Sequence, residues 1–348
     1  MNTYKVARIS GPGKVEIEEW EIPVLRDDEV LVKVLACAIC TSDQGVFRGE
    51  RESSYPVYAG HEISAVVQEV GPAVVSGVKP GDHVAVSRIN RCEQCTNCRK
   101  YTDNRCLNSR KLHRPGRPAG PGGFAELMAV PGYQVFKFPQ EIDRITASLT
   151  EPVACCISSV DKANVQPGDD VLVVGAGVMG LIHVNLLSLK GARVLVSEVA
   201  SERRRLAKDF GADVVLDPAG GPLAEQVGQV TGGKGVEAIF VTGGPPDLVS
   251  DLMGTCATGA TMVIYTSYHG EKGSKAEVDL NRIHYNEIKL VGTISPRKYD
   301  FQRAVALVAN GKIRVSQLVE RVFPFSRIQE AFEYAIRPGS YRVVVHME

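Results

Sequence analysis

Four cysteines in one short stretch of the chain have the spacing of a metal site. Cys92, Cys95, Cys98 and Cys106 follow the pattern C-x2-C-x2-C-x7-C. Thiolates are soft ligands, and four of them complete a tetrahedral shell around zinc with no position left for water. The spacing therefore predicts a structural zinc that folds a loop with little apolar surface of its own. Disulfides are disfavoured because such short spacings strain them, whereas the spacing alone leaves an iron–sulfur cluster open.

A second set of ligand-type residues is scattered along the chain. Cys40 follows a strand-like run, His61 and Glu62 stand in a Gly-His-Glu sequence, and Glu151 precedes a proline. Cysteine, histidine and carboxylate together make an open zinc site, which is the type that takes part in catalysis. Each residue alone is ordinary, since a lone cysteine is usually a small buried hydrophobe. The combination is what favours a catalytic metal.

The run from Val171 to Gly180 predicts a dinucleotide site. Its apolar half is followed by Gly175-Ala-Gly-Val-Met-Gly180 and then by a helix-like segment, and this context makes the G-x-G-x-x-G pattern specific. Gly175 is expected to make the tight turn, Gly177 to admit a pyrophosphate, and Gly180 to let the helix approach the sheet. Glu198, at the end of the next strand-like run, is expected to bind the adenosine ribose. The predicted coenzyme contacts are Gly175, Gly177, Val178, Met179, Gly180, Glu198, Arg203, Thr242 and Thr266.

The composition limits the classes of partner. The chain has 348 residues, of which 40 are basic and 40 are acidic, so no overall charge attracts nucleic acid or an anionic membrane. The opening run Met1–Trp20 lacks the apolar core of a signal peptide, and no apolar run has transmembrane length. Nine cysteines without such a signal indicate a reducing compartment. We therefore expect a cytoplasmic protein that acts on a small molecule, with no nucleic-acid or membrane partner.

Two unlike parts of the chain must position these residues. The first part has short runs of β-branched residues between Gly, Pro and Asp, and no helical period is recognisable before residue 143. From about residue 168, strand-like and helix-like segments alternate, which predicts an α/β, doubly wound parallel sheet. We expect a catalytic domain at 1–154, completed by 293–348, and a dinucleotide-binding domain at 155–292.

All of these features occur together in one family. Through Cys40, the Gly-His-Glu motif, the cysteine lobe and the glycine fingerprint, the chain resembles the zinc-dependent medium-chain dehydrogenases over essentially its whole length. Its Glu151-Pro pair is similar to the polyol branch, typified by sorbitol (L-iditol) and threonine dehydrogenases, whereas the alcohol dehydrogenase branch has a cysteine there. The resemblance implies a GroES-like, mostly β catalytic domain, a Rossmann domain, and a homodimer or homotetramer associated through the nucleotide-binding sheet.

The resemblance also implies an activity and roles for the site residues. The activity is hydride transfer between a secondary alcohol of a polyol, sugar or sugar derivative and NAD, with two zinc ions per chain. Ser42 would take the alcohol proton, Asp43 would orient His61, and Glu151 would alternate between direct ligation and a hydrogen bond to water at the metal. NAD is expected over NADP, because a phosphate would meet the like charge of Glu198. The implied catalytic residues are Ser42, Asp43, Glu62 and Glu151, and the implied ligands of the catalytic zinc are Cys40, His61, Glu62 and Glu151.

Three points stay open. Many relatives carry a histidine five positions after the catalytic cysteine, where this chain has Gly45, so the proton path beyond Ser42 is not identified. The loop 110–117 carries four fixed positive charges; either it faces the cleft and favours an anionic substrate, or it is a solvated basic loop, and Arg297 is equally ambiguous. A threonine-type amino-alcohol dehydrogenase and a non-catalytic protein that keeps the fold are the alternatives. A zinc-free quinone reductase is disfavoured, because it would lack both metal sites.

Overall fold

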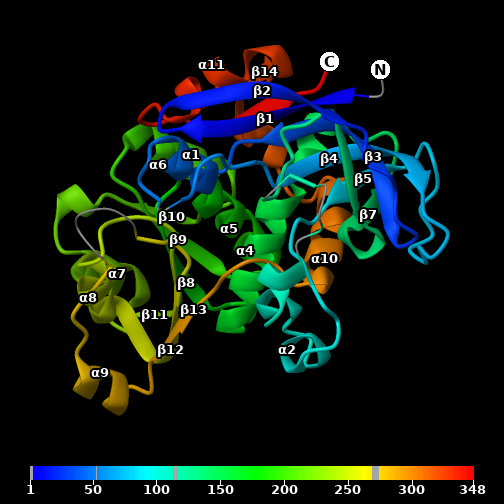
Figure 1. The fold of residues 1–348 in the computed structure, drawn as a ribbon. Helices are drawn as coiled ribbons and strands as arrows, with labels where there is room; N and C mark the ends of the chain where they lie inside the picture. The colour runs from blue at the N-terminus through cyan, green and yellow to red at the C-terminus, as the bar shows by residue number, and fades with distance from the viewer. Residues whose placement is uncertain (1–2, 52, 113, 115–116, 119, 269–273) are drawn as a thin grey trace. The chain divides into compact units, whose positions relative to one another are not determined.

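The structure, a computed structural model, describes residues 3–51, 53–112, 114, 117–118, 120–268 and 274–348. It separates into two compact units, residues 1–154 with 295–348, and residues 155–294 (Figure 1). The sequence predicts boundaries after residues 154 and 292. Within the described parts of the chain, no helix has both the length and the apolar character of a membrane span.

The second unit is built on a six-stranded parallel sheet, coloured green to orange in Figure 1. Its strand order is β10-β9-β8-β11-β12-β13, and every pair is parallel. The order reverses between β8 and β11, which is the place where open α/β sheets bind ligands. The predicted doubly wound sheet is therefore confirmed. The strands are β8 (Asp170–Val174), β9 (Arg193–Ser197), β10 (Val214–Leu216), β11 (Val236–Val241), β12 (Cys256–Ile264) and β13 (Lys289–Gly292).

The central strands of this sheet are buried on both faces, as a parallel sheet between helices requires. All five residues of β8 are buried, and Leu172, Ile239 and Met262 from β8, β11 and β12 belong to one apolar cluster. His183 of α5 is fully buried, and its Nε2 lies 2.8 Å from Ser159 Oγ. The helices of this unit are α5 (Val178–Leu189), α6 (Ser201–Asp209), α7 (Leu223–Thr231), α8 (Leu248–Leu252) and α9 (Leu280–Tyr285), and α4 (Thr150–Ala163) leads into it.

The first unit is built on a mainly antiparallel sheet of seven strands, with β1 and β2 as a separate pair. The order is β14-β15-β3-β4-β5-β7, and β6 pairs with β3 beside this path. The C-terminal strand β15 pairs with β3, with Val345 opposite Cys37. The end of the chain therefore completes the first unit, as the sequence indicates. The strands are β1 (Thr3–Gly11), β2 (Lys14–Glu21), β3 (Glu29–Ala38), β4 (Glu62–Val70), β5 (His83–Val86), β6 (Leu127–Pro131), β7 (Val135–Phe138), β14 (Val319–Pro324) and β15 (Arg342–His346).

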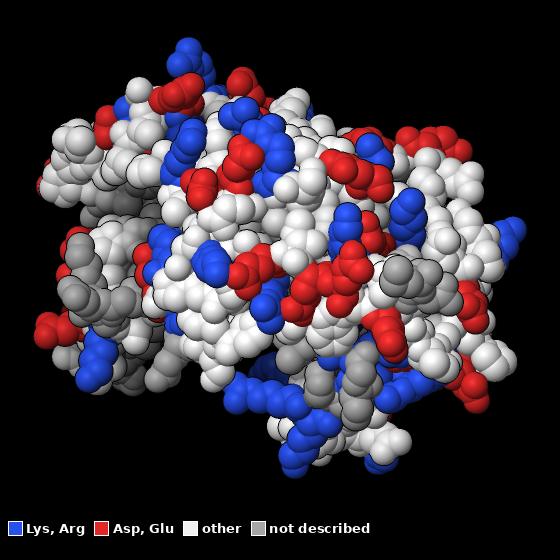
Figure 2. Space-filling model, turned by 45° about the horizontal axis from the view of Figure 1, so that its top comes forward, with Lys and Arg blue, Asp and Glu red and all other residues white. Residues whose placement is uncertain are grey.

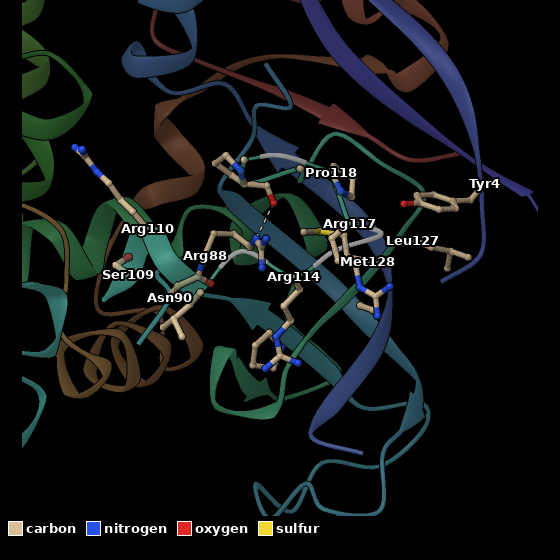
Figure 3. Close-up of a pocket in the computed structure, with 16 residues that line it drawn as sticks. Tyr4, Arg88, Asn90, Ser109, Arg110, Arg114, Arg117, Pro118, Leu127 and Met128 are labelled. Atoms are coloured by element: carbon tan, nitrogen blue, oxygen red, sulfur yellow. Dashed lines mark hydrogen bonds between the residues drawn. The ribbon is translucent and has the colours of Figure 1, made fainter. Parts of the chain in front are cut away.

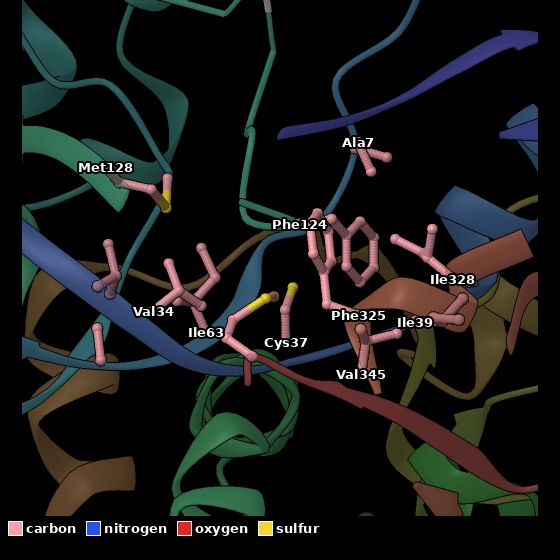
Figure 4. Close-up of a cluster of buried hydrophobic side chains, with 14 of the residues drawn as sticks. Ala7, Val34, Cys37, Ile39, Ile63, Phe124, Met128, Phe325, Ile328 and Val345 are labelled. Atoms are coloured by element: carbon pink, nitrogen blue, oxygen red, sulfur yellow. The ribbon is translucent and has the colours of Figure 1, made fainter. Parts of the chain in front are cut away.

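The core of the first unit anchors the elements that carry the candidate site. Figure 4 shows Cys37, Ile63 and Phe124 among its buried side chains. The ring of Phe332 in α11 (Ile328–Ala335) lies 5.4 Å from that of Phe124 and 5.3 Å from that of Phe47 in α1 (Thr41–Phe47). Two short helices, α1 and α2 (Thr96–Arg99), precede residue 143, where the sequence shows no helical period. Both are too short to show a helical period, and tertiary contacts such as that of Phe47 stabilise α1.

Basic and acidic side chains are mixed on the surface. Figure 2 shows Lys and Arg interspersed with Asp and Glu over most of the face in view. Some of them form exposed ion pairs, for example Arg48 with Glu50 at 2.7 Å. This mixture accords with the equal numbers of acidic and basic residues in the chain.

Candidate metal centres and coenzyme site

The four cysteines of the predicted structural site come together in the structure. Their Sγ atoms all lie within 4.8 Å of one another. The sulfur of Cys92 accepts hydrogen bonds from the Cys95 N–H and from the Asn108 side chain, both at 3.3 Å, and the sulfur of Cys106 accepts one from the Cys92 N–H at 3.3 Å. Tetrahedral zinc with Zn–S bonds of about 2.3 Å needs sulfurs about 3.8 Å apart. The cluster is therefore close to the size of such a shell.

The ionisation of these thiols supports the fit of a cation. Hydrogen bonds from the Asn108 side chain and from backbone N–H groups lower the pKa of Cys92 to about 6. Burial, together with the neighbouring thiols of Cys95 and Cys106, raises the pKa of Cys98 to about 12. Without a counter-charge the four thiols do not all ionise together, and a divalent cation supplies that charge. The four residues thus fit a structural zinc.

A buried ion pair fixes the base of this lobe. Arg91, which precedes the first cysteine, has its Nε 2.5 Å from Asp103 Oδ2, and both side chains are buried. The Arg91 guanidinium also donates to the carbonyl of Pro296 at 3.0 Å. The Tyr133 hydroxyl accepts the Arg91 backbone N–H at 3.0 Å. The lobe is therefore tied to the rest of the first unit by paired charge as well as by its thiols, a contact that sequence reasoning missed.

Cys40, His61 and Glu62 form the second cluster. One ligand atom of each lies within 4.8 Å of the others. Cys40 precedes α1 directly after β3, while Glu62 opens β4 and pairs with Ala38 of β3. Antiparallel pairing of neighbouring strands thus brings together residues that are distant in sequence. Glu151, in the first turn of α4, lies outside the cluster, although its charge acts on both His61 and Glu62.

The charges around His61 favour a cation. Asp43 Oδ1 lies 3.7 Å from His61 Nδ1, and the same carboxylate accepts the N–H of Cys40 at 3.0 Å and that of Gly60 at 3.4 Å. Burial alone would lower the pKa of His61, but the negative charges of Asp43, Cys40 and Glu151 raise it well above its ordinary value. The negative charges that keep a proton on the half-buried His61 also attract a metal ion, which would replace that proton.

The thiol of Cys40 responds to the same neighbours. Burial raises its pKa, but the charges of His61 and Arg342 outweigh burial and bring it to about 6. A thiol that ionises this readily is suited to metal ligation, because the thiolate is the ligand. Cys40 and His61 thus fit the open zinc site.

Glu62 is fully buried and faces Arg342 of β15. Its Oε1 lies 3.0 Å from Arg342 Nη2, and neither carboxylate oxygen has a regular hydrogen bond to another described residue. Burial raises the pKa of Glu62 well above its ordinary value, although Arg342 acts in the opposite direction. Arg342 also donates to the carbonyl of Ile39 at 2.9 Å, just before Cys40. Sequence reasoning missed Arg342, since only the pairing of β15 with β3 brings it here.

Ser42 lies on the first turn of α1 and is half-buried. The side of this helix at position 45 is occupied by another side chain, because a Cβ on Gly45 would lie only 3.1 Å from Cγ of Arg51. The stem of Arg51 thus packs where many relatives have a histidine. The role of Ser42 as the first proton acceptor stays a prediction, and the path beyond it stays unidentified.

The glycine fingerprint has the close contacts that its pattern requires. Gly175 has φ +91°, and a Cβ on Gly180 would lie 1.9 Å from the Gly175 carbonyl oxygen. A Cβ on Gly177 would meet nothing within 4 Å, which leaves open space beside the start of α5. Thr242, after β11, donates from Oγ1 to the carbonyl of Val174 at 2.8 Å and so lies at the switch point of the sheet. These residues fit a dinucleotide.

Glu198 lies at the end of β9, against the fingerprint turn. It is 6% exposed, and its two oxygens accept the N–H groups of Ala176 at 2.8 Å and Ala200 at 2.9 Å. Arg204 donates to the Glu198 carbonyl at 2.7 Å and pairs with Asp217 at 2.7 Å. Of the other expected contacts, Val178 and Met179 begin α5, Arg203 is half-buried on α6, and Thr266 donates its N–H to Val241 at 3.0 Å.

Two of the four basic residues of the loop 110–117 are paired with carboxylates, while Arg110 and Lys111 are exposed. Arg114 pairs with Asp28 at 2.6 Å and with Glu29 at 3.0 Å, and Arg117 pairs with Glu29 at 2.6 Å. Glu29 is fully buried at the start of β3. These two arginines therefore neutralise buried or nearby carboxylates instead of standing in solvent. Arg297 is likewise paired, at 2.6 Å, with the buried Asp300.

Comparison with known proteins agrees with this geometry. Residues 26–140 match the alcohol dehydrogenase GroES-like domain, and residues 178–310 match the zinc-binding dehydrogenase model. D-arabitol-phosphate dehydrogenase of Enterococcus avium is 28% identical over 99% of this chain and 97% of its own. D-arabinitol dehydrogenase 1 of Uromyces fabae is 30% identical over 92% of this chain and 91% of its own. L-threonine 3-dehydrogenase of Pyrococcus furiosus is 30% identical over 95% of this chain and 94% of its own.

Solved structures extend the likeness to the whole fold. A Sinorhizobium meliloti 1021 structure with bound NADP is 30% identical, has a TM-score of 0.87, and is matched over 99% of this chain and 100% of its own. An alcohol dehydrogenase of Escherichia coli CFT073 in complex with NADH is 26% identical, with a TM-score of 0.88 over 99% and 100%. Fold and relatives define an oxidoreductase that acts on CH–OH groups. The chain belongs to the zinc-dependent medium-chain alcohol dehydrogenase family.

Proposed function

We propose that this enzyme transfers hydride between a secondary alcohol of a polyol, sugar or sugar derivative and NAD. The cluster of Cys40, His61 and Glu62 is the observation that carries the proposal, since a few ligands of these types leave a metal position open for substrate. Two of the relatives above carry arabitol or arabinitol in their names. The threonine dehydrogenase among them keeps an amino alcohol as the second candidate.

The site residues have separate tasks in this reaction. Zinc held by Cys40 and His61, when bound, supplies a Lewis acid at the substrate hydroxyl. Ser42 accepts the alcohol proton, and Asp43 holds the His61 ring through its position 3.7 Å from Nδ1. Glu151 adds negative charge next to the cluster and is the proposed exchangeable ligand.

The second unit supplies the coenzyme site. Gly177, at the open start of α5, would hold the pyrophosphate of the coenzyme, and the helix N-terminus would stabilise its charge. Glu198 accepts the ribose hydroxyls through the lone pairs that its two backbone contacts leave over. Arg203, Thr242 and Thr266 are the further proposed contacts.

The assembly and location belong to the same proposal. β13 is an edge strand of the parallel sheet, and an edge strand can pair with another chain. We infer a homodimer or homotetramer that associates through this sheet, with no nucleic-acid or membrane partner. The nine cysteines are free of disulfides, which supports a reducing, cytoplasmic location.

A substrate panel tests the proposed function. Purified enzyme with NAD is offered polyols, sugars, sugar derivatives and threonine, and the absorbance of the reduced coenzyme is followed. A secondary alcohol of a polyol or sugar should give the highest kcat/KM, and His61→Ala should abolish it. Threonine as the best substrate would favour the amino-alcohol alternative. Enzyme loaded with zinc that turns over no alcohol at all would contradict the proposal.

A further inference from the structure

Arginine side chains surround a pocket in the first unit (Figure 3). The pocket has a volume of about 340 Å³, and its lining includes Tyr4, Arg88, Arg110, Arg114 and Arg117. This volume is at the lower end of the range for small-molecule sites. The pocket can therefore hold a small chemical group of a ligand, and positively charged side chains line it on several sides.

The four arginines differ in their counter-charges. Arg114 and Arg117 are neutralised by Asp28 and Glu29, as described above. In the view of Figure 3, the guanidinium of Arg110 extends away from Arg88, whose own guanidinium points between the loop at Pro118 and Arg114. Among the described residues neither Arg88 nor Arg110 pairs with a carboxylate, and of these two it is Arg88 whose guanidinium lies towards Arg114 and Pro118.

The partners of Arg88 are all neutral. Its Nε donates to the Pro121 carbonyl and its Nη1 to the Gln134 side chain, both at 2.6 Å. No carboxylate of the described residues pairs with it, and Nη2 has no hydrogen bond within the described chain. Burial lowers the pKa of Arg88 to about 10, although the Tyr133 hydroxyl acts in the opposite direction. The side chain is half-buried and is still charged at neutral pH, and no described carboxylate acts as its counter-ion.

The position of Arg88 relates it directly to the metal cluster. β4 and β5 pair antiparallel, and Ile63 opposite Val86 is the last pair at this end. His61 and Arg88 each lie two residues beyond that pair, outside the strands themselves. The Pro121 carbonyl, which accepts the Arg88 bond, lies two residues before Gly123, whose N–H donates to the carbonyl of Gly60 at 2.9 Å. Arg88 and the metal cluster therefore lie at the same end of this strand pair.

We propose that Arg88 binds an anionic group, a phosphate or a carboxylate, of a substrate whose alcohol lies at the metal cluster. A guanidinium with an unused N–H edge suits oxygen anions, which it binds with charge-assisted hydrogen bonds. The substrate is then a phosphorylated or acidic polyol or sugar, in preference to the neutral compound. This inference rests on the proposed function and narrows its substrate class.

A matched substrate series tests Arg88. Arabitol, arabitol phosphate and arabinonate are compared as substrates of the wild type, Arg88→Met, Arg88→Lys and the control Arg110→Met. The wild type should favour one of the two anions over arabitol, and the better anion identifies phosphate or carboxylate as the group that is bound. Arg88→Met should lower kcat/KM for that anion, relative to arabitol, by about 10- to 100-fold. Arg88→Lys should restore part of this ratio, and Arg110→Met should leave it unchanged.

Three results would overturn the inference, and a binding measurement separates it from the proposed function. The inference fails if the wild type prefers arabitol to both anions, or if Arg88→Met lowers kcat/KM equally for all three substrates. It also fails if Arg110→Met lowers the ratio of kcat/KM for the anion to that for arabitol as much as Arg88→Met does. The first result leaves the proposed function intact.

Calorimetric binding of arabitol phosphate and of arabinonate to the wild type and to Arg88→Met gives a readout without turnover. Weaker binding of one anion to the variant supports the site even if none of the three compounds is oxidised, and equal binding of both anions refutes it.

Discussion

Replacing Glu198 by glutamine is expected to reduce the preference for NAD over NADP. The carboxylate is 6% exposed, and each of its oxygens already accepts one backbone N–H, from Ala176 or Ala200. The remaining lone pairs can accept the ribose hydroxyls, whereas a ribose phosphate would meet a buried like charge. A hydrogen bond to a charged group contributes about 1.5–3 kcal/mol, and about 1.4 kcal/mol is tenfold in affinity. The ratio of kcat/KM for NAD to that for NADP should therefore fall by about 10- to 100-fold in Glu198→Gln.

The assay measures kcat/KM for both coenzymes with one alcohol substrate in the wild type, Glu198→Gln and Glu202→Gln. Glu202 is an exposed acid in the first turn of α6, so its loss should leave the ratio within about twofold, because solvent and salt screen a surface charge strongly. The glutamine also turns an amide NH2 towards one of two backbone N–H groups, so a lower Tm is expected for Glu198→Gln alone. A wild type that uses both coenzymes equally, or an unchanged ratio in Glu198→Gln, would refute the role of this residue.

Two further predictions concern a proton path and a buried base. Ser42→Ala should lower kcat by about 10²- to 10⁴-fold while the Kd for NAD, measured by fluorescence, stays the same; wild-type turnover would show another proton path. Burial lowers the pKa of His183 from 6.5 to about 4, so its neutral form stabilises the fold above pH 6.5, and this stability is lost as the pH falls towards 4. A tenfold change in proton affinity corresponds to about 1.4 kcal/mol. Between pH 6.5 and pH 4, the free energy of unfolding of the wild type should therefore fall by up to about 3 kcal/mol more than that of His183→Gln, measured by urea unfolding at each pH. Parallel curves for the two proteins would contradict this.

Local patterns in the sequence were enough to predict the sites that depend on short spacings. The cysteine lobe lies within one loop, and the glycine fingerprint lies within one strand–turn–helix, so their residues meet almost regardless of the rest of the fold. Alternation of strands and helices also predicts the parallel sheet, because a crossover helix forces neighbouring strands to run in parallel. In the open site, Cys40 and His61 could be paired only through the resemblance to a family.

The missed features depend on contacts between distant segments. Arg342 reaches Glu62 only because the last strand pairs with β3. Arg114 neutralises Glu29, which lies 85 residues away in the sequence, so its charge could not be assigned to a partner in advance. Arg88 lies two residues beyond the pairing of Val86 with Ile63, so its place at the same end of the sheet as His61 depends on the antiparallel pairing of β4 with β5. None of these three contacts leaves a periodic signal.

The zinc content of two matched variants, measured together with activity, tests the central claim most directly. The wild type should contain two zinc ions per chain, one in the four-cysteine lobe and one in the open cluster. His61→Ala should retain one zinc and a folded chain but lose turnover, whereas Cys95→Ser should lose the structural zinc and unfold at a lower temperature, because structural zinc contributes directly to folding. Mild chelation of the wild type should likewise remove the open-site metal and the activity first. An enzyme that stays fully active with only the lobe zinc bound would contradict the account.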